Sequence, residues 1–249
     1  MIKKIWITGA SSGIGRALAI KFSNEGWQVA ASARRENLLN DLNKNNPNIH
    51  AFVLDVKDEK SVRNVFQNIL QKFETLDICV FATGIHDPEA EKKLSSQKIR
   101  EIMETNFFGT LNCIMAVNSF FREKKDGHIA IVSSVAGYRG LPAASGYCAS
   151  KAALTSLAES LYFDFKRKNV KVSLISPGFI KPPMTDRNTF PMPMIKSPEY
   201  AAEKIFIGLT KKSSFEIHFP KSFTILLKLL KIMPNWLFFW LVERGVKRF

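Results

Sequence analysis

The chain has 249 residues, of which 46% are hydrophobic and 23% charged, and its formal net charge is +14. This composition excludes a disordered chain and allows one α/β domain or two small domains. The basic residues form no long run and match no nucleic-acid-binding motif, so nucleic acid is a weak candidate, which leaves an anionic membrane or a phosphorylated ligand.

The cysteines and histidines indicate no metal site. Cys79, Cys113 and Cys148 are widely spaced, and the four histidines are scattered without candidate partners. This usage fits a reducing compartment and predicts neither a disulfide framework nor a bound metal. The opening MIKKIWITGA runs into the first predicted strand, which leaves no room for a signal peptide. We therefore expect a cytoplasmic protein.

Short apolar, β-branched runs alternate with segments of helical period along the chain. The predicted strands are 3–8, 27–33, 49–56, 77–83, 128–134, 171–177 and 215–219. Nearly continuous apolar strands separated by helices indicate a parallel sheet covered on both faces. The expected fold is a Rossmann-type, doubly wound sheet of about seven strands, with a ligand site beyond the strands' carboxyl ends.

The domain organisation follows from the absence of internal linkers. No segment rich in proline and glycine divides the chain before about residue 220. We predict a single dinucleotide-binding catalytic domain over residues 1–220. Residues 221–249 then form an apolar and basic C-terminal extension.

The first predicted strand ends in TGASSGIG, where three glycines follow the pattern GxxxGxG. Glycines between a strand and a helix allow a tight turn and a close approach of the backbone to a pyrophosphate, which the helix N-terminus also attracts. A purely structural turn is the alternative. The predicted cofactor-binding residues of this segment are Thr8, Gly9, Ser11, Ser12, Gly13, Ile14 and Gly15.

The end of the second predicted strand bears on the choice of cofactor. In NAD-binding folds an acidic residue about 20 positions after the glycine loop holds the adenosine ribose. Here Ala33 occupies that slot and Arg34 follows it. An arginine binds a 2′-phosphate through charge-assisted hydrogen bonds, so Arg34 favours NADP(H) over NAD(H), the alternative being a solvated arginine at a helix start.

Tyr147 and Lys151 lie four residues apart in SGYCASKAAL. On a helix they share one face, and a cation beside a phenol lowers its pKa from about 10 toward neutral pH. Such a tyrosine can donate and accept protons. Taken alone, the pair also fits a surface helix with an ordinary lysine and a half-buried aromatic residue.

Together, these motifs resemble the short-chain dehydrogenase/reductase family over about residues 3–220. The resemblance rests on the glycine motif, on the YxxxK of Tyr147 and Lys151, and on Ser134 in IVSSVAG, thirteen residues before the tyrosine. Asn106 in METNFFGT matches the family's helical asparagine. The further cofactor contacts that the resemblance implies are Asp55, Val56, Gly84, Asn106, Tyr147, Lys151, Pro177, Gly178 and Ile180.

The resemblance implies a catalytic set of Asn106, Ser134, Tyr147 and Lys151. In such a mechanism Ser134 polarises the substrate carbonyl, NADPH provides a hydride and Tyr147 provides the proton. Lys151 lowers the pKa of the tyrosine and holds the nicotinamide ribose, and Asn106 anchors a water that leads to Lys151. The structural alternatives are a strand-end cap for Ser134 and an ordinary helix position for Asn106.

Two positions depart from the family pattern. Both asparagines of the family's NNAG are missing from the segment Phe81 to Gly84, although the glycine remains. Pro182 stands where the family often has a threonine that contacts the nicotinamide carboxamide. Thr185 or the backbone near Ile180 then has to replace that contact.

The C-terminal extension is apolar and basic. Phe223, Leu226, Leu227 and Leu230 follow a helical period, Pro234 interrupts it, and a second apolar segment spans residues 236–242. One continuous membrane span is excluded by the lysines and the proline, so the extension fits either a peripheral contact with an anionic membrane or packing over the cleft or a subunit interface.

The sequence thus predicts an NADPH-dependent oxidoreductase that interconverts a ketone and a secondary alcohol. The segment 179–196 is rich in Met, Phe and Pro, which indicates a lipophilic substrate. The family's long helix beginning near Tyr147 implies a homodimer. A non-catalytic NADP(H)-binding scaffold or regulatory protein at a membrane surface is the competing hypothesis.

Overall fold

The fold is a parallel sheet between two layers of helices, and the computed structural model describes residues 2–181, 192, 194–212 and 214–247. Within these residues seven strands pair in the order β3-β2-β1-β4-β5-β6-β7, all in parallel, which confirms the predicted doubly wound sheet. The strands are β1 (Lys4–Thr8), β2 (Gln28–Ala33), β3 (Ile49–Val53), β4 (Ile78–Phe81), β5 (His128–Val132), β6 (Lys171–Pro177) and β7 (Glu216–Phe219).

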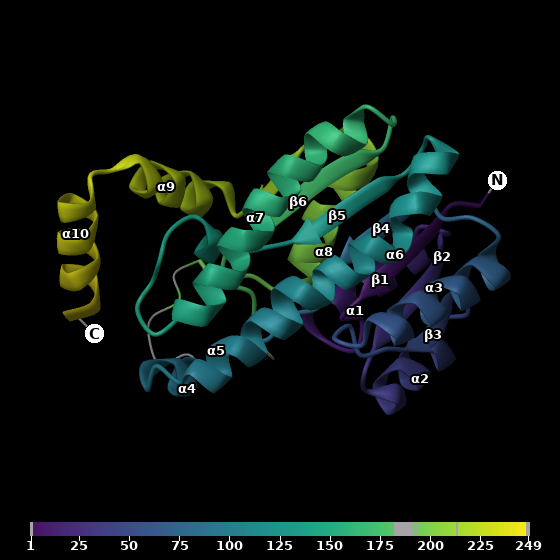
Figure 1. Cartoon of the computed structure of the whole chain (residues 1–249), viewed down its shortest axis with the longest axis horizontal. Helices are drawn as coiled ribbons and strands as arrows, with labels where there is room; N and C mark the ends of the chain where they lie inside the picture. The colour runs from purple at the N-terminus through teal and green to yellow at the C-terminus, as the bar shows by residue number, and fades with distance from the viewer. Residues whose placement is uncertain (1, 182–191, 193, 213, 248–249) are drawn as a thin grey trace.

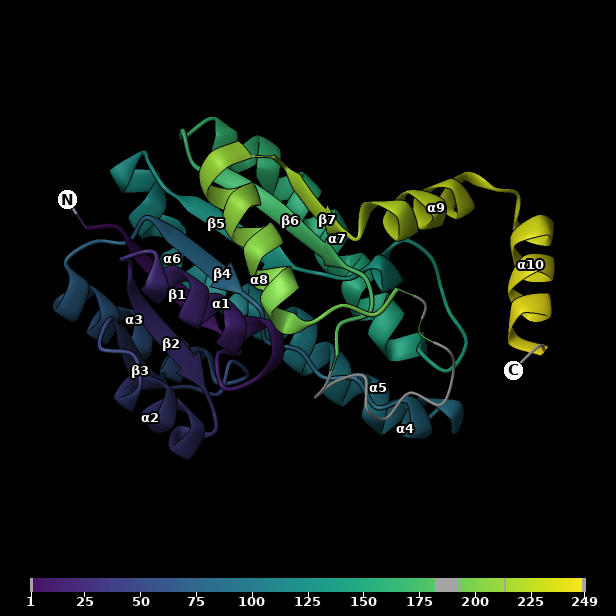
Figure 2. The same ribbon diagram turned by 180° about the vertical axis from the view of Figure 1, so that it is seen from behind.

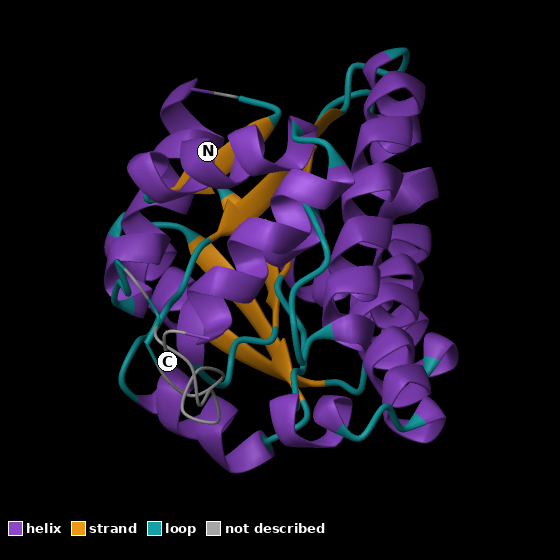
Figure 3. Cartoon of the chain, turned by 90° about the vertical axis from the view of Figure 1, so that its left-hand side faces the viewer, coloured by secondary structure: helices purple, strands orange, loops and turns teal. Residues whose placement is uncertain are grey.

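The helices lie on both faces of this sheet (Figures 1–3). The helices before β5 are α1 (Gly13–Asn24), α2 (Glu36–Lys44), α3 (Glu59–Phe73), α4 (Pro88–Lys92), α5 (Ser96–Met103) and α6 (Gly109–Lys124). After β5 come α7 (Ser145–Lys166), α8 (Pro198–Ile207), α9 (Lys221–Ile232) and α10 (Asn235–Lys247). Three short turns complete the list, namely η1 (Glu104–Phe108), η2 (Val135–Gly137) and η3 (Gly208–Lys212).

Two apolar cores lie against the two faces, and the alternation of side chains along each strand divides them. Ile5 and Ile7 of β1 belong to the core under α1, α2 and α8. Trp6, between them in sequence, belongs to the core under α3, α6 and α7. The Trp6 indole Nε1 donates to Ser32 Oγ at 2.9 Å, so burial of this polar atom leaves no hydrogen bond unmade. Near-continuous apolar strands are therefore required, because both faces are buried.

Three predicted strands extend too far at their carboxyl ends. The pairing of β2 with β3 stops at Ala33 and Val53, and β5 ends at Val132. Asp55 then accepts the amide of Lys57 at 3.1 Å, which forms a turn, and the strand β4 likewise ends at Phe81 rather than at residue 83. The residues that were expected at the ends of strands therefore lie in loops, where their polar groups face the cleft.

A π-helical turn joins α5 and α6. This turn, η1, contains Asn106 and interrupts the regular helical hydrogen bonds between Ser96 and Lys124. The additional residue in such a turn changes the direction in which a side chain points, and π-turns are frequent at functional sites. The sequence predicts the helix around Asn106 but not this turn.

The extension after β7 forms two helices that project from the body of the protein (Figure 1). Arg139, in the loop after η2, attaches them. Its Nη1 donates to the carbonyl oxygens of Leu230 and Met233, each at 2.8 Å, and its guanidinium lies 4.1 Å from the centroid of the Phe238 ring. The hydrogen bonds satisfy carbonyls at the C-terminus of α9 that lack helical partners.

A second set of polar contacts attaches α9 to the sheet. Lys228 forms an ion pair with Glu216 of β7, and Glu216 Oε1 accepts the hydroxyl of Tyr138 at 2.5 Å. The apolar residues of the predicted helical period in α9 lie in two different environments. Phe223 is buried, whereas Leu226 is 53% exposed. No helix in the described part of the chain has the length and apolar character that a membrane span needs.

Candidate functional site

A cavity of about 1170 Å³ opens beyond the carboxyl ends of the strands, where the fold places a ligand. Every predicted site residue lines it except Thr8 and Asn106, which lie behind its wall. The residues that line it are Gly9, Ser11, Ser12, Gly13, Ile14, Gly15, Arg34, Asp55, Val56, Gly84, Ser134, Tyr147, Lys151, Pro177, Gly178 and Ile180.

The glycine loop forms one end of the cavity. Gly9 has a φ of +70°, and a Cβ there would lie 2.9 Å from the carbonyl oxygen of Ala82. A Cβ at Gly15 would lie only 2.4 Å from the carbonyl oxygen of Gly9. Ser12 precedes α1 without capping it by its side chain, so the amides of the first turn remain directed at the cavity. This cradle fits the pyrophosphate of a dinucleotide.

Arginines close the same end of the cavity. Arg34 lines it as expected, but Arg35 makes the closer contact with the glycine loop. Its Nη2 donates to Ser11 Oγ at 2.8 Å and to Ser12 Oγ at 2.6 Å. Arg35 was not among the predicted cofactor contacts, although it is adjacent to Arg34 in the sequence. Two adjacent guanidinium groups at this point fit a phosphate ester better than a neutral ribose hydroxyl.

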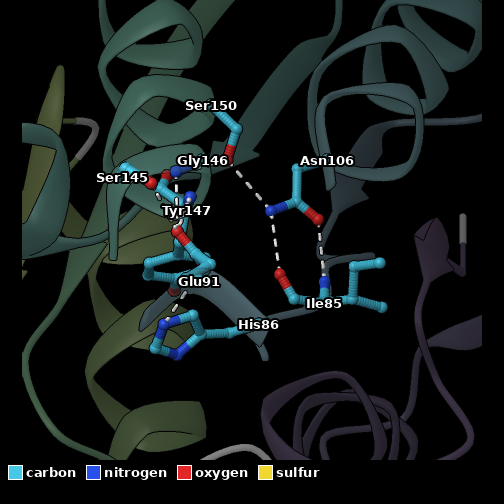
Figure 4. Close-up of polar contacts among 8 residues, drawn as sticks. All are labelled: Ile85, His86, Glu91, Asn106, Ser145, Gly146, Tyr147 and Ser150. Carbon is cyan, nitrogen blue, oxygen red and sulfur yellow. Dashed lines mark hydrogen bonds and ion pairs between the residues drawn. The ribbon is translucent and has the colours of Figure 1, made fainter. Parts of the chain in front are cut away.

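Asn106 is fully buried and acts on the wall behind the cavity (Figure 4). Its Oδ1 accepts the amide of Ile85 at 2.7 Å, and its Nδ2 donates to the Ile85 carbonyl and to Ser150 Oγ, both at 3.0 Å. These bonds fix the loop after β4 against α7. Thr8 has a similar role, because its Oγ1 accepts the amide of Ala82 at 3.2 Å.

Ser134, Tyr147 and Lys151 meet at the middle of the cavity. The Ser134 side chain opposes the rise in the pKa of Tyr147 that burial causes, and Ser134 Oγ accepts the amide of Ala136 at 3.1 Å and so caps η2. Lys151 is 3% exposed, and its Nζ donates to the carbonyl oxygen of Val132 at 3.0 Å. The three groups come from the end of β5 and from one face of α7, as the helical spacing requires.

The expected effect of Lys151 on Tyr147 is not found in this structure. Burial raises the pKa of Tyr147 to about 12, and the hydrogen bond from Ser134 opposes this rise only in part. Burial also lowers the pKa of Lys151 to about 8. The ammonium group lies 5.6 Å from the centroid of the Tyr147 ring and is directed at Val132. Desolvation therefore exceeds the attraction that the sequence spacing suggested.

The remaining predicted contacts lie around the rim. Asp55 and Val56 line the cavity, and Asn112 Nδ2 donates to the carbonyl of Val56 at 3.0 Å. Gly178 also lines it, and its amide donates to the carbonyl of Phe219 at 2.8 Å. Pro182 and Thr185 fall outside the described residues, as does much of the predicted substrate segment.

Two polar residues at the site went unnoticed in the sequence, His86 and Glu91 (Figure 4). The His86 ring stacks against Tyr147, and Glu91 Oε2 accepts the amide of Gly146 at 2.6 Å. The one local signal for such a partner is that α7 begins after Ala144, which has no capping side chain. Nothing nearby in the sequence identifies Glu91 as the cap.

In the described residues no cluster of three or more His, Cys, Asp or Glu side chains suits a metal ion.

Comparison with known proteins gives consistent results. A family model described as short chain dehydrogenase matches residues 3–216. An uncharacterized oxidoreductase of Myxococcus xanthus is 33% identical over 93% of each chain. A 3-oxoacyl-acyl-carrier-protein reductase of Thermotoga maritima is 28% identical over 84% of this chain and 91% of its own. A short-chain dehydrogenase structure from Streptomyces avermitilis superposes with a TM-score of 0.82, at 26% identity, over 92% of this chain and 91% of that one.

The buried ammonium of Lys151 predicts an effect on stability. Because its pKa falls from 10.5 to about 8 on folding, the unfolded chain holds a proton between these pH values that the folded chain has lost. Stability therefore rises with pH across this window, and the burial penalty is complete below it. We expect Lys151→Met to increase the free energy of unfolding at pH 7 by about 1–3 kcal/mol, an increase that disappears toward pH 10.5.

Urea denaturation at several pH values measures this difference. Lys60→Met, at an exposed lysine of α3, is the matched control and should leave the pH dependence unchanged. A loss of stability in Lys151→Met at pH 7, or a gain that does not vary with pH, would contradict the argument.

Proposed function

We propose that this chain, which belongs to the short-chain dehydrogenase family and is therefore an oxidoreductase, uses NADPH to reduce a lipophilic ketone to a secondary alcohol. The observation that carries the proposal is a cavity lined by Ser134 and Tyr147 together with the glycine loop. Proton donor and dinucleotide cradle thus face one ligand space.

The proposed roles follow from the positions of the side chains. A bound nicotinamide supplies the hydride. Ser134 donates a hydrogen bond to the substrate carbonyl, and Tyr147 donates the proton that the new alcohol requires. With its pKa raised by burial, Tyr147 is protonated at neutral pH and so carries the proton that reduction consumes. Lys151 would hold the nicotinamide ribose, and Asn106 fixes the loop against α7.

Turnover with a substrate panel tests this proposal. We expect oxidation of NADPH with long-chain or polycyclic ketones, and a loss of at least about 100-fold in kcat for Tyr147→Phe, which removes only the proton donor. Affinity for NADPH should stay within about twofold. Tyr162→Phe, on the same helix but away from the cavity, is the control. Retained turnover in Tyr147→Phe would refute the role of this tyrosine.

The preference for NADP(H) rests on Arg34 and Arg35. Both line the adenine end of the cavity, and no acidic side chain follows β2 before them. Their charges suit the 2′-phosphate that distinguishes NADPH from NADH.

Binding measurements with both cofactors separate the two arginines. We expect Arg34→Ala and Arg35→Ala each to weaken NADPH binding by about 10-fold or more while NADH binding changes little. Arg63→Ala on α3, whose guanidinium is exposed and remote from the cavity, is the control. Equal affinity of the unsubstituted chain for NADH and NADPH would contradict the assignment.

The apolar walls of the cavity support a lipophilic substrate. Leu141, Phe179, Phe223, Leu227 and Val242 line the end opposite the glycine loop, and the last three belong to α9 and α10. The extension, proposed as a unit distinct from the catalytic domain, thus contributes to the substrate space. The similar protein from Thermotoga maritima is named for reduction of a 3-oxoacyl group, a ketone on an acyl chain.

The extension also supports peripheral contact of a cytoplasmic enzyme with a membrane. Its exposed apolar residues are Ile225, Leu226, Leu229, Ile232, Trp236, Phe239 and Trp240. The exposed cations Lys221, Lys231 and Arg244 lie on the same two helices. Aromatic and aliphatic side chains beside cations are typical of segments at anionic lipid surfaces.

A homodimer is proposed on separate grounds, because Met115 on α6 and Phe163 on α7 are exposed.

Sedimentation with liposomes tests the membrane contact. We expect the full chain to bind vesicles that contain anionic lipid, and Ile232→Glu/Trp236→Glu to lose most of this binding. Substitution at Ile2, an exposed residue just before β1 and outside the extension, gives the control Ile2→Glu. Equal sedimentation of the unsubstituted and doubly substituted chains would exclude this contact.

A non-catalytic NADP(H)-binding scaffold remains the competing function. It shares the cofactor cradle and the extension but requires nothing of Ser134 and Tyr147. NADPH binding without turnover on the whole ketone panel would favour it.

A further inference from the structure

His86 lies directly against the proposed proton donor. Its ring centroid is 4.5 Å from that of Tyr147, with 31° between the two planes (Figure 4). The His86 side chain is 8% exposed and lines the cavity. A flat imidazole in contact with the phenol limits the directions in which the phenol can tilt, so His86 is placed to orient the hydroxyl.

Glu91 reaches the same point from α4 and caps the helix that carries Tyr147. Its Oε2 accepts the amide of Gly146 at 2.6 Å and that of Tyr147 at 3.2 Å. The residue at the start of α7, Ala144, has no side chain that could do this. A carboxylate here satisfies amides that lack helical partners and interacts favourably with the helix dipole. The side chain is nonetheless fully buried.

The other oxygen of Glu91 faces the imidazole. Glu91 Oε1 lies 3.5 Å from His86 Nε2, and neither atom has a hydrogen bond among the residues that the structure describes. The backbone of Ala143, a residue held at a φ of +52°, opposes the lowering of the His86 pKa by burial and so acts as an acceptor for its ring. With the imidazole proton on Nδ1 and an ionised carboxylate, two lone pairs would face each other in a buried site. One proton between them removes this conflict.

We propose that His86 and Glu91 share one proton and thereby set the position and the acidity of Tyr147. The proposal deepens the proposed function and rests on Tyr147 being the proton donor. While the pair holds its proton it is neutral. When the proton is lost, a negative charge stands beside the phenol and disfavours the phenolate.

Burial supports this arrangement at both partners. It raises the pKa of Glu91 and lowers the pKa of His86, so the neutral imidazole with a carboxylic acid is the favoured form. When Glu91 is ionised, its negative charge contributes to the raised pKa of Tyr147. The other titratable groups around the pair are Asp87 on the same loop, Lys92 on α4, Lys98 and Glu101 on α5, and Cys148 and Lys151 on α7.

Two substitutions separate charge from position. In Glu91→Gln the amide oxygen still accepts the α7 amides and the amide nitrogen donates to His86, so the pair is neutral at every pH. In His86→Gln an amide donates to the Glu91 carboxylate, so the charge is retained. We expect the Tyr147 ionisation midpoint to fall by on the order of half a pH unit or more in Glu91→Gln and not to fall in His86→Gln.

The measurement is ¹⁹F NMR of the cofactor-free chain grown with fluorotyrosine, which brings phenol ionisation into the range where the protein is folded. The Tyr147 signal is assigned by its absence in Tyr147→Phe. His50→Gln, at the edge strand β3, is the control and should change nothing. Equal downward shifts in both variants, or none in Glu91→Gln, would overturn the proposal.

A measurement on the unsubstituted chain covers the case in which a variant does not fold. The ¹⁵N signal of His86 Nε2 should be that of a nitrogen that accepts a hydrogen bond from the Glu91 carboxylic acid, and it should change to that of a free nitrogen in one titration step when the shared proton is lost. A signal typical of a nitrogen without a hydrogen bond throughout the folded pH range would overturn the shared proton. Since neither measurement uses turnover, its outcome is independent of whether the chain reduces ketones.

Discussion

Parallel pairing of β1 with both β2 and β4 is the constraint on which the rest of the molecule depends. From β1 the chain builds outward to β3 on one side and to β7 on the other. The direction of winding reverses between β1 and β4, so the loops that follow these strands diverge and leave a crevice. The glycine loop follows β1, Gly84 follows β4 and Ser134 follows β5. The sheet order therefore brings the cofactor cradle and the reacting groups to one cavity.

Buried polar groups hold the site together, although burial of each group costs free energy of hydration. Asn106, Lys151 and Glu91 each lose hydration, and each recovers part of that loss through backbone groups of a neighbouring element. These bonds join the loop after β4, the end of β5 and the start of α7. The same bonds that satisfy the buried groups thus fix the distance between Ser134 and Tyr147, which couples the stability of the site to its geometry.

The C-terminal helices are attached by few side chains but reach the substrate end of the cavity. Arg139 comes from the loop just after Ser134, and it satisfies carbonyls at the end of α9. Phe223 and Val242 then line the cavity while the outer faces of the same helices remain apolar and exposed. One extension therefore provides both an inner apolar wall of the cavity and an exposed apolar outer surface.

Local patterns were sufficient for the fold. Strand composition fixed the number and direction of the strands, because both faces of a parallel sheet must be apolar. The spacing of Tyr147 and Lys151 placed them on one helical face, because that depends only on the period of the helix. The ends of the strands at Val53 and Val132 were overestimated, since apolar residues continue into loops that the cleft, rather than the core, covers.

The pKa values and the contacts of the site residues depend on segments that are distant in the sequence. Burial from all sides, and not the nearby lysine, sets the pKa of Tyr147. Arg35 contacts the glycine loop because β2 ends beside the start of α1. Glu91 caps α7 from 55 residues away, and His86 packs on Tyr147 only because the loop after β4 passes over that helix. Sequence by itself determined the elements and the candidate reacting groups, since these follow from local periodicity and motif. Tertiary structure decided their ionisation and their partners, because desolvation and hydrogen bonding depend on every element that surrounds a group.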